Sequence, residues 1–182
     1  MCAHRTTRQH AIAKMMAGPK LTPPERAIPT LHLTCGLPCA GKTTLAREIE
    51  QRGALRLTAD EWIIHFHGDD AAAARDGAIR SSVEAALLEL AMRVLSLGAD
   101  VVLDFGVWAR SEREEMRGRA AAVGARSELH FVDAPLDVLI TRVAARNADL
   151  PPGTFAIDEA EMRLWATWLE RPSGDELLPR EV

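Results

Sequence analysis

The sequence has few cysteines and no long apolar segment, and each absence narrows its class. Its 182 residues include only Cys2, Cys35 and Cys39, too few for a closed disulfide framework and in keeping with a reducing compartment. No apolar run approaches the ~20 residues that cross a bilayer, and residues 1–20 hold no apolar stretch long enough for a secretory signal. CxxC and HExxH motifs and internal repeats are also absent. We therefore expect a soluble, cytoplasmic protein without a membrane attachment.

Positive charge is scarce in most of the chain. Residues 1–24 carry four basic side chains and no acidic one, so the remainder holds 18 basic against 26 acidic side chains, a net charge of −8. A long polyanion needs a basic stripe on its partner, so the composition argues against nucleic acid. The basic arm could contact nucleic acid or act as a targeting peptide, but we favour a frayed terminus.

Apolar segments alternate with helical ones along the chain. Short strands are expected at 30–35, 54–58, 100–105 and 128–132, and helices at 42–52, 71–97, 111–124, 135–147 and 158–170. Residues 111–114 and 158–161 have the form of capping boxes, which mark helix starts. This alternation predicts an α/β fold with a central parallel sheet and right-handed crossovers. We expect a flexible arm at 1–29, one domain at 30–171 and a C-terminal tail at 172–182.

The strongest motif is residues 36–43, which read Gly-Leu-Pro-Cys-Ala-Gly-Lys-Thr and match G-x-x-x-x-G-K-[ST] at every fixed position. A strand before it and a helix after it are the context that this motif requires. Its glycines let the backbone wrap an anion, and its amides with the helix N-terminus hold phosphates. The expected nucleotide-binding residues are Gly36, Leu37, Pro38, Cys39, Ala40, Gly41, Lys42, Thr43 and Thr44.

Two residues of this loop have distinct expected roles. Lys42 is the sole lysine between residues 21 and 182, and it would reach the β- and γ-phosphates of ATP, while Thr43 would coordinate Mg²⁺. For Cys35 and Cys39, which flank the loop, we favour small apolar filling over a redox switch.

Two absences separate the classes of protein that carry such a loop. The [NT]KxD motif through which GTPases usually read guanine does not occur. Hydrolytic ATPases usually place a second acid after the aspartate that ends a strand, to position water, whereas Asp104 is followed by Phe105. Both absences favour phosphoryl transfer to a bound acceptor over transfer to water.

Four polar side chains follow the expected strands at the edge where ligands bind in open α/β sheets. Asp60 could accept the proton of an attacking hydroxyl or cap the next helix. Asp104 could hold Mg²⁺, bind the acceptor, or bond to loop amides as a buried carboxylate. Arg142 and Arg146 share one helix face before residues 147–153, which have the composition of a mobile lid. They could close over the phosphates or form an exposed basic face.

With these residues in place, the sequence resembles the small P-loop kinases, a group that includes the kinase half of polynucleotide kinases, chloramphenicol phosphotransferases and zeta toxins. The resemblance covers about residues 30 to 170. Within that group, residues 103–113 and 151–155 look like bacterial ATP-binding proteins described as predicted kinases. The resemblance implies the three-layer sandwich of P-loop NTPases with a short helical lid, and ATP and Mg²⁺ as cofactors.

The resemblance also implies roles for single residues. Asp60 matches the general base, Asp104 the acidic residue that ends the next strand, and Arg142 and Arg146 the lid arginines. Polynucleotide kinases carry an arginine three residues after the base, for the 3′ phosphate of the acceptor, and Ile63 stands there instead. We therefore expect an ATP-dependent kinase that phosphorylates a hydroxyl of a small molecule. The alternatives are a 5′-hydroxyl polynucleotide or nucleotide kinase, and a nucleotide-binding switch with little turnover.

Overall fold

In the computed structural model, which describes residues 27–68, 76–152 and 154–182, four strands form one parallel sheet. Their order across the sheet is β2-β3-β1-β4. The strands agree with those expected from the sequence to within two residues at each end: β1 Thr30–Cys35, β2 Leu55–Leu57, β3 Val101–Leu103 and β4 Arg126–Phe131. The expected N-terminal arm lies outside the described residues up to position 26.

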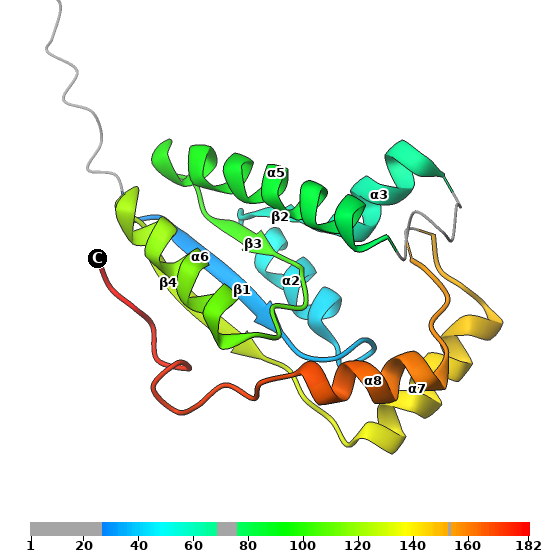
Figure 1. The fold of residues 1–182 in the computed structure, drawn as a ribbon. Coiled ribbons are helices and arrows are strands. Elements are labelled where there is room, and N and C mark those ends of the chain that lie inside the picture. The colour runs from blue at the N-terminus through cyan, green and yellow to red at the C-terminus, as the bar shows by residue number, and fades with distance from the viewer. Residues whose placement is uncertain (1–26, 69–75, 153) are drawn as a thin grey trace, which may run out of the picture.

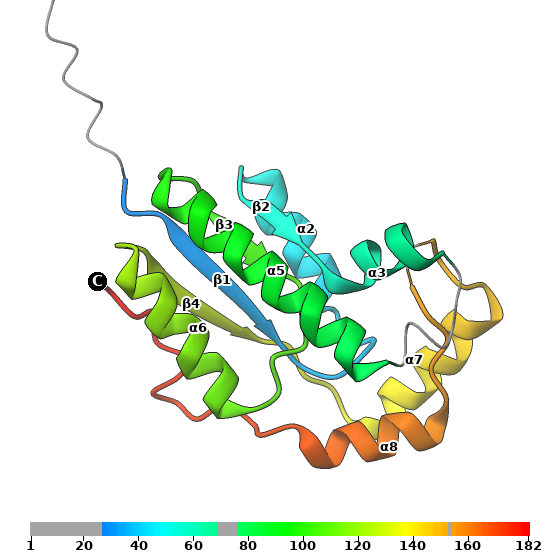
Figure 2. The same cartoon turned by 45° about the horizontal axis from the view of Figure 1, so that its top comes forward.

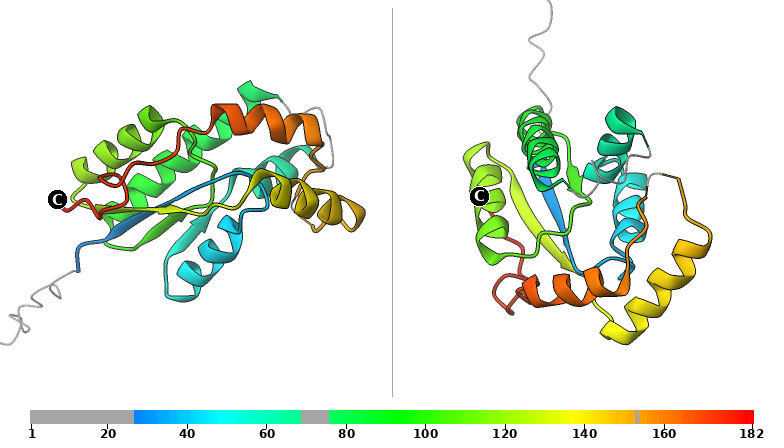
Figure 3. Two further views of the ribbon diagram at one scale, coloured as in Figure 1. Left: turned by 90° about the horizontal axis from the view of Figure 1, so that it is seen from below. Right: turned by 45° about the vertical axis from the view of Figure 1, so that its right-hand side comes forward.

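Helices cover both faces of this sheet, so the expected three-layer α/β sandwich is confirmed. In Figure 3, α2 lies on one side of the strands and α5 and α6 on the other, and Figures 1 and 2 show α7 and α8 paired beyond the end of β1. Among the described residues no helix combines the length and apolar composition needed to cross a membrane. The helices are α2 Lys42–Gln51, α3 Ala59–His67, α5 Gly77–Ser96, α6 Arg110–Ala122, α7 Leu136–Ala148 and α8 Glu159–Trp168.

Strand alternation decides what each face of the sheet buries. Leu31, Leu33 and Cys35 of β1 point into the main core, which α5 and α6 close from one side, because successive side chains of a strand point to opposite faces. His32 lies on the other face. Strand β3 is fully buried along its length, which suits its wholly apolar sequence, Val-Val-Leu.

The parallel register brings the ends of the strands together. Cys35 lies opposite Phe131, and Leu57 opposite Leu103. The loops that follow β1, β2, β3 and β4 therefore leave the sheet at one edge, where residues distant in the sequence can meet.

Of the two capping boxes expected from the sequence, the structure contains one. The capping box at Asp158 is confirmed, since its carboxylate accepts from the amide of Glu161, whose own carboxylate accepts from the amide of Asp158. The box expected at Ser111 is wrong: α6 begins at Arg110, with Ala109 at its N-cap. Two carboxylates accept from the amides at this start: Glu112, three residues on, from Ala109, and Glu170, far along the chain, from Arg110.

The described part of the helix expected over 71–97 is α5, Gly77–Ser96. Helix α5 starts at Gly77, where Asp76 accepts hydrogen bonds from the amides of Ala78 and Ile79. Residues 71–75 of the expected helix lie outside the described residues.

The segment after residue 171 packs along α6 and β4. The Arg113 guanidinium, 1% exposed, donates to the Glu176 carboxylate, 2% exposed, at 2.7 Å. Arg117 donates to the carbonyl of Glu176, and a short antiparallel bridge pairs Ser127 with Arg180. These contacts make the C-terminal segment part of the domain's packing.

Glu176→Gln tests that packing. Removing one charge of a buried pair leaves the other uncompensated, which costs roughly 3–5 kcal/mol, so we expect the melting temperature to fall by about 6–20 °C. The neighbouring Asp175→Asn, whose carboxylate is solvent-exposed, is the control and should melt nearly as the parent does. Equal melting of all three proteins in thermal denaturation would contradict a structural role for the pair.

The same pair predicts a dependence on pH. The hydrogen bond from Arg113 lowers the pKa of Glu176 below its ordinary value. A carboxyl with a depressed folded-state pKa contributes stability above its unfolded pKa and loses it as the pH falls through the folded one. We expect the parent to lose more stability than Glu176→Gln between neutral pH and the acid side of the ordinary glutamate pKa. If the melting temperatures of the parent and of Glu176→Gln fell by the same amount across that pH range, the prediction would be contradicted.

Candidate active site

The loop between β1 and α2 has the backbone of a phosphate-binding turn. Gly41, the N-cap of α2, has φ 115°, and Gly36 has φ 144°. A Cβ at Gly36 would lie 2.1 Å from the carbonyl oxygen of Val132, so no other residue fits there. Cys39 also takes a left-handed conformation, with φ 60°. The chain thus turns tightly and enters α2 with its amides at the helix N-terminus, where an anion binds.

Lys42 lies inside this turn. Its Nζ donates to the carbonyl of Leu37 at 2.9 Å. Burial lowers the pKa of Lys42, and the negative charges of Asp104 and Asp60 oppose that shift. The ammonium is therefore held at the loop, with two carboxylates close enough to act on it.

Thr43 and Asp104 meet across the sheet edge. Asp104 follows β3 and has a side chain that is 3% exposed, and Thr43 lies near enough to act on the pKa of its carboxyl. Burial raises the pKa of Asp104, while Thr43, Lys42 and Arg56 act to lower it. A hydroxyl and a carboxylate side by side are oxygen donors that fit Mg²⁺, and they are the residues that would hold it.

Asp60 lies in the first turn of α3, at the end of β2. Its carboxylate accepts from the Arg80 guanidinium of α5 at 2.7 Å, with the two side chains 43% and 37% exposed. The charge of Asp60 acts on both Lys42 and Asp104. It therefore lies at the same edge of the sheet as the phosphate loop and remains open to solvent, as an acceptor hydroxyl would require.

The structure separates the two lid arginines. Arg142 of α7 donates to the carbonyl of Cys39, in the phosphate loop, at 3.3 Å. Arg146, one turn on, donates instead to the carbonyl of Phe155 at 3.0 Å, and its buried Nε finds no partner among the described residues. Asn147 likewise bonds to Ile157. In this structure Arg142 reaches the loop, whereas Arg146 fastens the connection between α7 and α8.

The other expected loop residues divide into buried and open ones. Leu37 and Ala40 pack against α7 and α8, while Thr44 is exposed. Cys35 is fully buried, and burial raises the pKa of its thiol to about 11. A thiol in that environment is inert filling.

Three side chains that the sequence did not predict at the site hold its residues in place. Arg56 of β2 joins the Asp104 carboxylate, at 3.4 Å, to Glu61, at 2.6 Å. Arg80 pairs with Asp60, and the indole of Trp108 donates to the carbonyl of Gly36 at 3.0 Å. A cation inside an otherwise apolar strand was the one available signal, at Arg56. Arg80 and Trp108 lie 20 and 72 residues from their partners.

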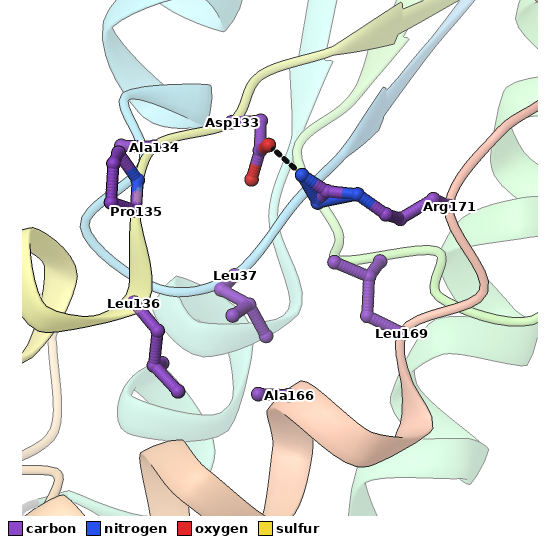
Figure 4. A pocket seen from close by; sticks show the side chains of 8 residues that line it. All are labelled: Leu37, Asp133, Ala134, Pro135, Leu136, Ala166, Leu169 and Arg171. Carbon is purple, nitrogen blue, oxygen red and sulfur yellow. Dashed lines mark hydrogen bonds and ion pairs between the residues drawn. The ribbon is translucent and has the colours of Figure 1, made fainter.

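A pocket of about 300 Å³ opens beside the phosphate loop, between the N-terminal end of α7 and the C-terminal end of α8 (Figure 4). Of the phosphate loop, Leu37 lines this pocket, and an ion pair between Asp133 and Arg171 crosses it. The pocket is lined by Leu37, Asp133, Ala134, Pro135, Leu136, Ala166, Leu169 and Arg171. The candidate catalytic side chains therefore lie outside this pocket, on the open edge of the sheet.

Comparison with known proteins places this geometry in a family. A family model described as an AAA domain matches residues 31–172, which is most of the chain. The chain belongs to this family. No protein of curated function matches this AAA-domain chain in sequence.

Solved structures show the same fold at low sequence identity. A gluconokinase from Sinorhizobium meliloti is 21% identical with a TM-score of 0.59, over 84% of this chain and 81% of its own. An APS kinase from Mycobacterium tuberculosis, in complex with AMPPNP and APS, is 20% identical with a TM-score of 0.57, over 81% and 85%. A chain of the Pnkp1/Rnl/Hen1 RNA repair complex is 20% identical with a TM-score of 0.64, but this AAA-domain chain spans only 44% of its length. The fold is that of the small P-loop kinases.

Proposed function

We propose that this protein is an ATP-dependent kinase that transfers the γ-phosphate to a hydroxyl of a small molecule. The observation that supports the proposal is the position of Lys42, Thr43, Asp104 and Asp60, which all follow strands at one end of the sheet, with electrostatic coupling between Lys42, Asp104 and Asp60. The structural neighbours support the reaction class, since they include kinases for gluconate and APS, the second bound to an ATP analogue.

Each of these residues has a separate role in the proposed phosphoryl transfer. The loop amides and Lys42 bind the ATP phosphates, and Mg²⁺ held by Thr43 and Asp104 would neutralise charge between them. Asp60 accepts the proton of the acceptor hydroxyl as its oxygen forms a bond to the γ-phosphorus. The bond from that phosphorus to the β-phosphate oxygen breaks, and ADP leaves. Arg142, which already contacts the loop, stabilises the transferred phosphoryl group.

Arg80 belongs to the acceptor side of this scheme. Its ion pair with Asp60 keeps a cation beside the attacking hydroxyl, where it can orient the base or bind an anionic group of the acceptor. Ile63, where a polynucleotide kinase has its 3′-phosphate arginine, is fully buried in the core. Arg146 can join the phosphates only if the α7–α8 connection rearranges, so its role is secondary in our proposal.

A 5′-hydroxyl of a nucleotide or polynucleotide is the second candidate acceptor. The likeness to a chain of an RNA repair complex favours it, and Arg80 offers a cation that Ile63 does not. Against it stands the acidic composition of residues 25–182, which weakens attraction to a long polyanion.

Acceptor-dependent ADP release tests the proposal. The purified chain with ATP and Mg²⁺ should release ADP slowly alone, and faster with one class among sugars and sugar acids, aminoglycoside-type alcohols, nucleosides and 5′-hydroxyl oligonucleotides. Phosphorylated product identified by mass spectrometry would name the acceptor. Release that is equally fast with and without every acceptor would contradict transfer to a hydroxyl, and would identify a hydrolase or a switch.

A further inference from the structure

A second cluster of chemically active side chains lies on the sheet away from the phosphate loop. His32 of β1 lies opposite Glu128 of β4 in the parallel register, and His130 follows on the same face of β4, because side chains two apart in a strand share a face. The Nδ1 atom of His32 is 3.0 Å from Nε2 of His130 and 3.5 Å from Oε2 of Glu128, and that oxygen is 4.0 Å from Nε2 of His130.

These separations are close to those of a metal's ligand atoms. A tetrahedral zinc ion with ligands at about 2.0–2.1 Å holds neighbouring donor atoms about 3.4 Å apart. The three measured separations surround that value, so small side-chain rotations would place all three donors around one ion. Two imidazoles and one carboxylate are also a donor set that Zn²⁺ takes, with a water in the fourth position.

The surroundings orient the donors for this use. Arg126 lies 3.8 Å from the other oxygen of Glu128, Oε1, which leaves Oε2 to face the histidines. Burial lowers the pKa of both His32 and His130, which favours the neutral rings that bind metal. Charges of both signs surround the cluster: the negative charge of Asp100 acts on His32, and the positive charges of Arg126 and Arg52 act on His32 and His130, respectively.

The cluster also has room and access. It borders a cavity of about 330 Å³ between β1, β4 and α2, whose remaining walls include Leu45, Ile49 and Arg52. All three candidate ligands are half-buried, so an ion and a bound water can enter from solvent. The hydrogen bond that now joins the two rings would be replaced by bonds to the ion.

We propose that His32, Glu128 and His130 form a binding site for a divalent transition metal, with Zn²⁺ the best fit, that joins β1 to β4. Imidazole ligands select zinc-class ions over Mg²⁺, so this site is separate from the Mg²⁺ ligands expected at Thr43 and Asp104. The ion would stabilise the strand pair from which the phosphate loop emerges.

The test is Zn²⁺ binding to the full chain by titration calorimetry, with thermal denaturation as a second readout. At a hundredfold excess over the dissociation constant, we expect Zn²⁺ to raise the melting temperature by about 5–10 °C, and excess Mg²⁺ not to compete. His130→Ala should weaken binding at least tenfold and abolish the shift. Glu128→Gln keeps the size of the side chain but removes its charge, so it decides the matter if His130→Ala does not fold.

The control is the double variant His65→Ala/His67→Ala, which removes two exposed histidines of α3 outside the cluster and should bind as the parent does. In the parent, Co²⁺ should show tetrahedral ligand-field bands without thiolate-to-metal charge transfer, which excludes the cysteines as ligands. No binding, a thiolate spectrum, or binding unchanged in both His130→Ala and Glu128→Gln would overturn the proposal and leave the histidine contact as simple packing.

Discussion

Asp60→Asn should bind ATP nearly as well as the parent while acceptor-dependent transfer falls by ~10²–10⁴-fold, the usual worth of a positioned base. The reason is geometric: a base touches the acceptor hydroxyl, whereas the phosphate loop holds the nucleotide. Asparagine matches the shape of aspartate, and the change removes no helix cap, because the N-cap of α3 is Thr58 and not Asp60. ATP affinity, melting temperature and acceptor-dependent ADP release are measured on one preparation.

The ion pair with Arg80 makes a competing outcome possible. If Asp60 serves only that pair, Asp60→Asn lowers the melting temperature slightly, since pairs this exposed contribute about 0–1 kcal/mol, and turnover stays at the parent's level. That result would remove the general-base role and direct the search to Asp104. Asp137→Asn is the matched control, because Asp137 also lies in the first turn of a helix and is exposed; it should retain both turnover and stability.

Lys42→Ala should reduce phosphoryl transfer by ~10²–10³-fold or more and weaken ATP binding, while the protein remains folded. Its ammonium is positioned at the loop before any nucleotide arrives, by the bond to the Leu37 carbonyl, and preorganised charge of this kind is where transition-state stabilisation is largest. Single-turnover transfer and ATP titration give the two effects separately, and circular dichroism checks the fold.

Arg47→Ala provides the comparison for that variant. Arg47 lies on the same helix, α2, and is exposed, so its removal takes away one positive charge without touching the loop. It should keep turnover within about twofold, as exposed substitutions away from special features usually do. A folded Lys42→Ala protein that retains both ATP affinity and turnover would refute the phosphate-loop interpretation itself.

Much of the architecture could be predicted because its signals are local. The four strands are short segments with apolar residues at alternating or successive positions, and the alternation of strands with helices leaves a parallel sheet as the natural solution. The phosphate loop combines a fixed spacing with positions that only glycine can occupy, such as Gly36 against the Val132 carbonyl. The capping box at Asp158 closes within four residues, so its residues alone determine it.

Other features could not be read locally because the partner lies far along the chain. At the start of α6, the amide of Arg110 donates to the carboxylate of Glu170, which lies 60 residues further along the chain. Arg146 follows Arg142 by one helical turn, yet the α7–α8 connection draws it to Phe155 and away from the loop. The buried pair of Arg113 and Glu176 joins α6 to the segment that we expected to be a C-terminal tail.

By itself, then, the sequence determined the fold class, the phosphate loop and the strand ends at which polar residues gather, since each follows from short-range spacing and backbone geometry. Tertiary structure alone decided which side chains meet there. Parallel pairing placed Asp104 against Thr43, helix packing placed Arg80 against Asp60, and strand register placed His32 against Glu128 and His130. Such contacts depend on the packing of elements tens of residues apart, and no local pattern encodes that packing.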